Sequence, residues 1–228
     1  MLRQIADAAH VALVLPPVSG KPVLNPPASR QQRQSLWRLV TAYPEILPRG
    51  SVRWRVMVRL AAVVALVLDT GARTGELVRL TTGSLAPDLS TVTIVRRAQG
   101  GGSVTETVPL SPSTQLALRR WLEIRDEVVG ALTGDVKALL VTVHGGGPQP
   151  ADHHGPRPPG LPLSDDSLRG WYAATVAKLN EETAGQYGWW EPMPRTLEAL
   201  RRGVGGKTDA AGTALTGSGT EANTATAA

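Results

Sequence analysis

Apolar and polar positions repeat along the 228-residue chain with two different periods. In most stretches apolar residues recur every three or four positions, which is the spacing of one face of a helix. Helices are therefore expected over residues 31–42, 57–68, 112–124 and 165–180, with a short one starting at Leu197. Two β-branched stretches alternate instead, at 91–95 and 104–110, and the glycines 100–102 between them favour an antiparallel hairpin. The pattern predicts a mainly α fold with one small antiparallel hairpin, of the α+β class.

The most apolar stretch runs from Met57 to Leu68 and is interrupted only by Arg59. A helix of this composition must be covered on most sides, so we expect it at the centre of the fold. About a dozen apolar residues fall short of the ~20 that a bilayer-spanning helix needs, which argues against a membrane partner.

A tight turn follows this helix, from Asp69 to Glu76. Gly71 is expected to end the helix, because glycine tolerates the left-handed conformation, and Thr74 is expected to cap a short second helix. Glu76 then lies in the first turn of that helix, near the positive end of its dipole, where it can hold Arg73 in place. The simplest interpretation is an Arg73–Glu76 pair at a helix corner. The other is an arginine presented to an anion.

Composition narrows the class of partner. The chain has no cysteine, which excludes disulfides and thiolate metal sites and is typical of an intracellular, cytoplasmic protein. Its net charge of +5 at pH 7 favours a polyanionic partner. Most of the positive charge is arginine, which binds phosphate through two parallel hydrogen bonds where lysine acts as a point charge.

The stretch Leu66–Leu80, with Arg73 and Glu76 at its centre, resembles the first-arginine box of the tyrosine recombinases, the phage-integrase family. The predicted hairpin and the helix after it follow in the order of that family. The resemblance implies a catalytic-domain-like fold over residues 31–202, in which Arg73 grips the scissile phosphate of DNA and Glu76 supports it. It also implies double-stranded DNA as the partner and a role in DNA recombination and integration, as in mobile elements.

A second motif of that family, His-Xaa-Xaa-Arg, is resembled by Glu198-Ala199-Leu200-Arg201. The resemblance makes Arg201 the second phosphate-binding arginine and puts Glu198 at the position of the histidine. A carboxylate there repels a phosphate unless Arg201 or Arg202 neutralises it. Without the resemblance, residues 197–202 are an ordinary charged helix.

The hairpin departs from the family pattern. It carries no lysine near its turn, where the family has one that is thought to protonate the leaving hydroxyl. Arg96 and Arg97 lie there instead. Because a guanidinium essentially never gives up its proton, we expect these two arginines to bind DNA phosphate rather than to act as acids.

The nucleophile of the family is also missing. It follows the second arginine, whereas Arg201 comes after every tyrosine of this chain, namely Tyr43, Tyr172 and Tyr187. The third box, with its histidine or tryptophan, is absent beyond Arg202. We therefore expect a DNA-binding protein that does not cleave DNA alone and that acts as a remnant or beside a complete recombinase or a second copy. The alternative is a non-catalytic helical interaction protein with no DNA activity.

Other segments carry no chemistry of their own. Residues 1–30 contain paired prolines and predict an arm or linker, while 203–228 are rich in Gly, Ala, Thr and Ser and are expected to be disordered. No metal is expected, since Asp152-His153-His154 lies in a proline-rich loop without a carboxylate cluster. No cofactor is expected either, because the run Gly203–Thr208 lacks the first glycine of a nucleotide-binding loop.

Overall fold

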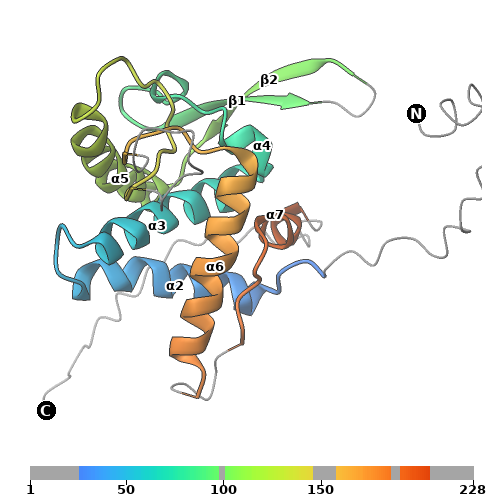
Figure 1. The fold of residues 1–228 in the computed structure, drawn as a ribbon. Coiled ribbons are helices and arrows are strands. Elements are labelled where there is room, and N and C mark those ends of the chain that lie inside the picture. Colours follow the sequence, from blue (N-terminus) through green and yellow to red (C-terminus); the bar gives the residue numbers. More distant parts are fainter. Residues whose placement is uncertain (1–25, 98–100, 146–157, 186–190, 206–228) are drawn as a thin grey trace, which may run out of the picture.

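The computed structural model describes residues 26–97, 101–145, 158–185 and 191–205 (Figure 1). The elements follow in the order α2 (Arg30–Ile46), α3 (Val52–Thr70), α4 (Thr74–Leu77), the 3-10 turn η1 (Thr82–Ser84), β1 (Thr91–Arg97), β2 (Ser103–Pro109), α5 (Pro112–Gly130), α6 (Asp165–Thr183) and α7 (Leu197–Gly205). The fold is mainly helical with a two-stranded antiparallel sheet, as the sequence pattern predicts. No helix in these four ranges is long and apolar enough to cross a membrane.

Helix α3 forms the centre of the core, which confirms the expectation from its composition. Every residue from 57 to 67 is buried, and α3 packs against α2, α5 and α7 (Figure 1). The helix ends at Gly71, whose φ of 60° is left-handed and whose N–H donates to the carbonyl oxygen of Val67. The end of α3 therefore delivers the chain directly into the turn before α4.

The core of the described residues includes the charged side chain of Arg59. Arg59 on α3 is only 1% exposed. Its Nη1 donates to the carbonyl oxygen of Val141 at 2.8 Å, and its guanidinium carbon lies 3.9 Å from the centre of the Trp171 ring on α6. Removal from water lowers the pKa of Arg59 to about 9. A carbonyl oxygen and the face of an aromatic ring thus take the place of the carboxylate that a buried cation would otherwise need.

Strands β1 and β2 pair over their full length, from Thr91 opposite Pro109 to Arg97 opposite Ser103. Alternate residues of β1 are buried, whereas β2 is exposed along most of its length. In Figure 1 the hairpin begins beside α4 and extends away from the helices. Strand β1 therefore carries Arg96 past the turn that holds the first-arginine motif.

Helix α2 runs past the boundary expected from the sequence. It includes Pro44 and ends at Ile46, whereas the apolar pattern predicts an end at residue 42. Proline lacks an N–H, so Pro44 removes one intrahelical hydrogen bond from the last turn, yet the helix continues for two more residues. The N–H of Leu47 donates to the carbonyl oxygen of Tyr43 and closes the helix.

The two ends of the described chain lie against each other. The N–H of Ala28 donates to the carbonyl oxygen of Ala199 on α7 at 2.9 Å, so residues 26–29 form a strap across this helix. Gly203 lies under the strap, and a Cβ there would be 2.5 Å from the carbonyl oxygen of Ala28. Helix α7 continues to Gly205, three residues into the segment expected to be disordered. The rest of that segment and residues 1–25 lie outside the described residues.

Candidate nucleic-acid interface

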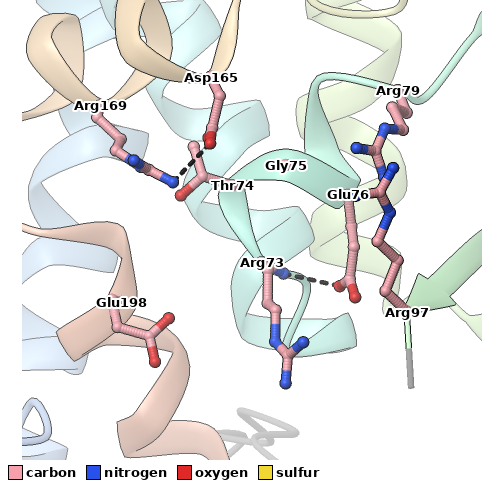
Figure 2. A pocket seen from close by; sticks show the side chains of 9 residues that line it. All are labelled: Arg73, Thr74, Gly75, Glu76, Arg79, Arg97, Asp165, Arg169 and Glu198. Carbon is pink, nitrogen blue, oxygen red and sulfur yellow. Dashed lines mark hydrogen bonds and ion pairs between the residues drawn. The ribbon is translucent and has the colours of Figure 1, made fainter. Parts of the chain in front are cut away.

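A pocket of about 450 Å³ opens at the N-terminal end of α4 (Figure 2). Four separate elements line it, namely the turn 73–76 with Arg79, the end of β1 with Arg97, the start of α6 with Asp165 and Arg169, and α7 with Glu198. Four arginines and three carboxylates therefore face one hollow. Such a surface suits an anion, provided that the anion can compete with the carboxylates for the guanidiniums.

The turn before α4 holds Arg73 by its backbone. Arg73 is the N-cap residue, with φ −77° and ψ 156°, and its N–H donates to Oε2 of the buried Glu76 at 2.8 Å. Thr74, expected to be the cap, is the first helical residue instead, because the Glu76 carboxylate already satisfies the N–H of the capping position. Within the described ranges the Arg73 guanidinium makes no hydrogen bond or ion pair, so of the two interpretations left open by the sequence the side-chain pair with Glu76 is not formed. Figure 2 shows this guanidinium extending away from the turn.

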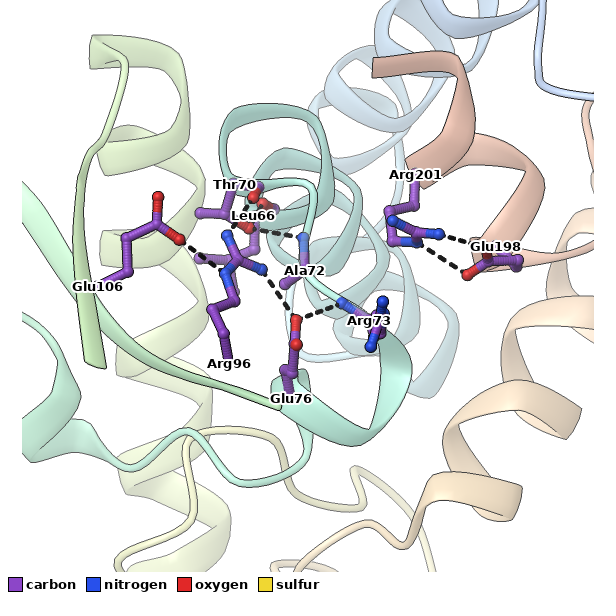
Figure 3. A network of polar contacts seen from close by, with 9 residues as sticks. All are labelled: Leu66, Thr70, Ala72, Arg73, Glu76, Arg96, Glu106, Glu198 and Arg201. Carbon is purple, nitrogen blue, oxygen red and sulfur yellow. Dashed lines mark hydrogen bonds and ion pairs between the residues drawn. The ribbon is translucent and has the colours of Figure 1, made fainter. Parts of the chain in front are cut away.

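Arg96 of β1 completes the support of this turn (Figure 3). Its Nη1 donates to Oε2 of Glu76 at 2.8 Å, its Nε to Oε2 of Glu106 at 2.7 Å and its Nη2 to the carbonyl oxygen of Thr70 at 2.5 Å. Burial acts to lower the pKa of Arg96, but the hydrogen bonds to the two carboxylates outweigh it and raise the pKa. All three guanidinium nitrogens thus serve internal acceptors, which suits a positioning residue better than the DNA contact expected from the sequence. Arg97, the next residue, lies exposed at the pocket.

On α7, Glu198 and Arg201 form a two-point ion pair (Figure 3). The Nε of Arg201 donates to Oε2 of Glu198 at 2.8 Å, and its Nη2 donates to Oε1. This bonding lowers the pKa of Glu198 and raises that of Arg201, so both are charged at neutral pH. The charge of Arg73 also stabilises ionised Glu198, and the charge of Glu76 also acts on Arg201. Arg73 therefore lies close enough to Glu198, and Arg201 close enough to Glu76, for their charges to interact.

Comparison with known proteins decides the fold. The tyrosine recombinase XerC of Corynebacterium glutamicum is 37% identical over 87 residues, which are 38% of this chain and 26% of that protein. The Tn1549 transposon integrase in complex with circular intermediate DNA matches with a TM-score of 0.51 and 16% identity, over 89% of this chain and 60% of that one. This chain has the tyrosine-recombinase catalytic-domain fold.

A second solved structure agrees with this tyrosine-recombinase fold. The XerH site-specific recombinase bound to palindromic difH substrate matches with a TM-score of 0.51 and 13% identity, over 82% of this chain and 43% of that one. No family model matches the chain. The matched region spans less than two thirds of each of these relatives.

Tyr43 and Tyr172, the two tyrosines that the structure describes, lie away from the pocket. Tyr172 on α6 is fully buried, its hydroxyl donates to the carbonyl oxygen of Pro194 at 3.1 Å, and burial raises its pKa. The Tyr43 hydroxyl lies 3.4 Å from a carboxylate oxygen of Glu182. The Tyr43 ring lies 5.6 Å from the guanidinium carbon of Arg53 at the start of α3. That end of α3 is about 25 Å along the helix axis from the end that meets the pocket. Tyr187 lies outside the described residues.

Three pocket residues carry no signal of their own in the sequence, namely Arg79, Asp165 and Arg169. Asp165 and Arg169 form an ion pair one turn apart at the start of α6, a pattern that is common on exposed helices and does not reveal a site. Arg202, expected to bind DNA, adds its charge to the environment of Glu198 but does not line the pocket. Within the described residues no group of three or more metal-ligating side chains occurs, and Asp152-His153-His154 lies outside them.

Proposed function

We propose that this chain binds double-stranded DNA by its backbone phosphates at the α4 pocket, as a tyrosine-recombinase-like domain that takes part in site-specific recombination or integration in the cytoplasm. The observation that carries the proposal is the contrast between the backbone and the guanidinium of Arg73. Its backbone is fixed by the buried carboxylate of Glu76, while its guanidinium is exposed at the pocket. A phosphate can therefore bind Arg73 without first breaking an internal pair, and a fixed backbone reduces the entropy lost on binding.

Two further observations support DNA as the anion. Arg79 and Arg97 are exposed at the same pocket, so more than one phosphate can be contacted along a strand. Both solved relatives were determined with DNA, the Tn1549 integrase with circular intermediate DNA and XerH with its difH substrate. The unit we assign to this function is the predicted domain 31–202, extended by the strap 26–29 and by the last turn of α7. A complete recombinase or a second copy of the chain would act beside it.

A salt titration of duplex binding tests the proposal. The affinity of the wild-type chain for a fluorescent duplex is measured by anisotropy over a series of salt concentrations, beside Arg73→Ala and Arg119→Ala. Arg119 is the matched control, because it is an exposed arginine on α5 and does not line the pocket. For Arg73→Ala we expect about a tenfold loss of affinity and a salt slope shallower by about 0.9, the value for one phosphate contact.

Arg119→Ala should leave both the affinity and the slope near those of the wild type. Equal losses in the two variants would show that binding follows net charge and has no site at α4. Absence of binding at low salt would favour the alternative, a helical protein that contacts other proteins only.

A further inference from the structure

The guanidinium of Arg201 is already occupied by a carboxylate of its own helix. Glu198 lies one turn before it, and the two parallel contacts, Nε to Oε2 and Nη2 to Oε1, form the fork with which arginine binds a phosphate. Arg73 differs in this respect, since its guanidinium makes no such contact within the described residues. The two arginines are therefore not equally ready for DNA.

Glu198 also faces the place where a phosphate would bind. Its side chain lines the pocket together with Arg73, whose charge acts on it (Figure 2). Figure 3 shows Arg73 between the Glu76–Arg96 contacts and the Arg201–Glu198 pair. A phosphate that approaches Arg73 thus meets a negative charge beside it, and finds Arg201 engaged.

We propose that Glu198 is an internal competitor for the DNA phosphate, so that Arg201 contacts DNA only when the Glu198–Arg201 pair opens. This inference rests on the proposed function and deepens it, because it assigns Glu198 the role of weakening phosphate binding at that site. The side chains of Glu198 and Arg201 are 51% and 26% exposed. An ion pair exposed to this degree is weak, so a phosphodiester can displace it. The chain then binds DNA with one open arginine first and a second one only after exchange.

The test is a gain of affinity. Removing the carboxylate charge with Glu198→Gln should tighten duplex binding about three- to tenfold and steepen the salt slope by up to about 0.9, the value for one phosphate contact. Glu198→His is a second variant that removes the charge with a different side chain, and a melting curve for each shows that α7 is still packed. Asp135→Asn is the charge-matched control, because its carboxylate is 79% exposed and neither it nor its partner Lys137 lines the pocket.

The double variant Glu198→Gln with Arg201→Ala separates release of Arg201 from a general change of charge. In the Arg201→Ala background Glu198→Gln should no longer steepen the salt slope, because there is no second guanidinium to release. A salt slope that still steepens there, an equal gain of affinity in Asp135→Asn, or no gain in Glu198→Gln itself would overturn the proposal. If Arg73→Ala weakens binding as expected while Glu198→Gln changes nothing, the competitor is refuted and the DNA site stands. If neither the wild-type chain nor any variant binds duplex DNA, the proposed DNA site itself is refuted.

Discussion

Arg96 donates to the same carboxylate oxygen of Glu76 that accepts the backbone N–H of Arg73, each contact being 2.8 Å long. Arg96 also contacts Glu106 of β2 and the last carbonyl of α3, that of Thr70. The hairpin, the end of α3 and the turn before α4 are therefore joined through one guanidinium. The position of Arg73 therefore depends on Arg96, which lies 23 positions further along the chain. The guanidinium of Arg96 bonds to acceptors within the protein.

Replacing Arg96 by alanine should destabilise the fold by about 2 kcal/mol, because it leaves the buried Glu76 carboxylate without its cation. The side chain of Arg96 is 23% exposed, so the loss is smaller than for a fully buried pair. Arg97→Ala, at the exposed neighbouring position, should change the free energy of unfolding by less than about 0.5 kcal/mol. Urea unfolding followed by tryptophan fluorescence measures both. Equal effects at the two positions would contradict the positioning role of Arg96.

Replacing Gly203 by alanine should loosen the strap over α7. The new Cβ would lie 2.5 Å from the carbonyl oxygen of Ala28 and 2.6 Å from Nη1 of Arg33, so the backbone of residues 26–29 must move. We expect a loss of about 1 to 3 kcal/mol in the free energy of unfolding. Gly170→Ala is the matched control, since no atom lies within 4 Å of its Cβ position in α6. That change should stabilise the fold by up to about 1 kcal/mol through helix propensity, and a loss there as large as at Gly203 would count against the strap.

Local signals account for what the sequence predicts correctly. Three such signals are the apolar run of α3, the left-handed Gly71 after it, and Ser111 with Pro112 at the start of α5. Each acts on residues only a few positions away. Each reports a backbone preference that holds in almost any fold. The mainly helical architecture and the antiparallel hairpin follow from them.

Contacts between distant segments account for what the sequence does not reveal. Arg96 pairs with Glu106 because the hairpin register sets Arg96 opposite Val104, which makes Glu106 a diagonal neighbour, and this register depends on the length of the turn. The meeting of Asp165 and Arg169 with the turn at Arg73 depends on how α6 packs on α4, which no local pattern encodes. The sequence therefore names the arginines together with Glu76 and Glu198, but not Glu106 or Asp165, whose positions depend on contacts between distant segments.

The buried Arg59 should depend on the aromatic ring beside it. Trp171→Leu removes the face that lies 3.9 Å from the guanidinium carbon, and we expect a loss of about 3 kcal/mol in the free energy of unfolding. Arg59→Met removes the buried charge and should be neutral or stabilising. In the Arg59→Met background the same tryptophan change should be milder by about 1 to 2 kcal/mol. Purely additive effects in this double-mutant cycle would mean that the ring supplies only apolar packing.

Covalent capture of DNA by the 228-residue chain is not expected. The hydroxyl of Tyr172 is buried, donates to the carbonyl oxygen of Pro194 and has a raised pKa, so it can neither reach a phosphate nor ionise readily. Tyr43, on α2, contacts Arg53 at the start of α3, and the pocket lies at the other end of α3, about 25 Å away along its axis. A nicked suicide duplex should therefore give no denaturant-resistant adduct with this chain, while a complete tyrosine recombinase on its own site serves as the positive control. An adduct that disappears when Tyr43, Tyr172 or Tyr187 is changed to phenylalanine would identify a nucleophile inside the chain and contradict this prediction.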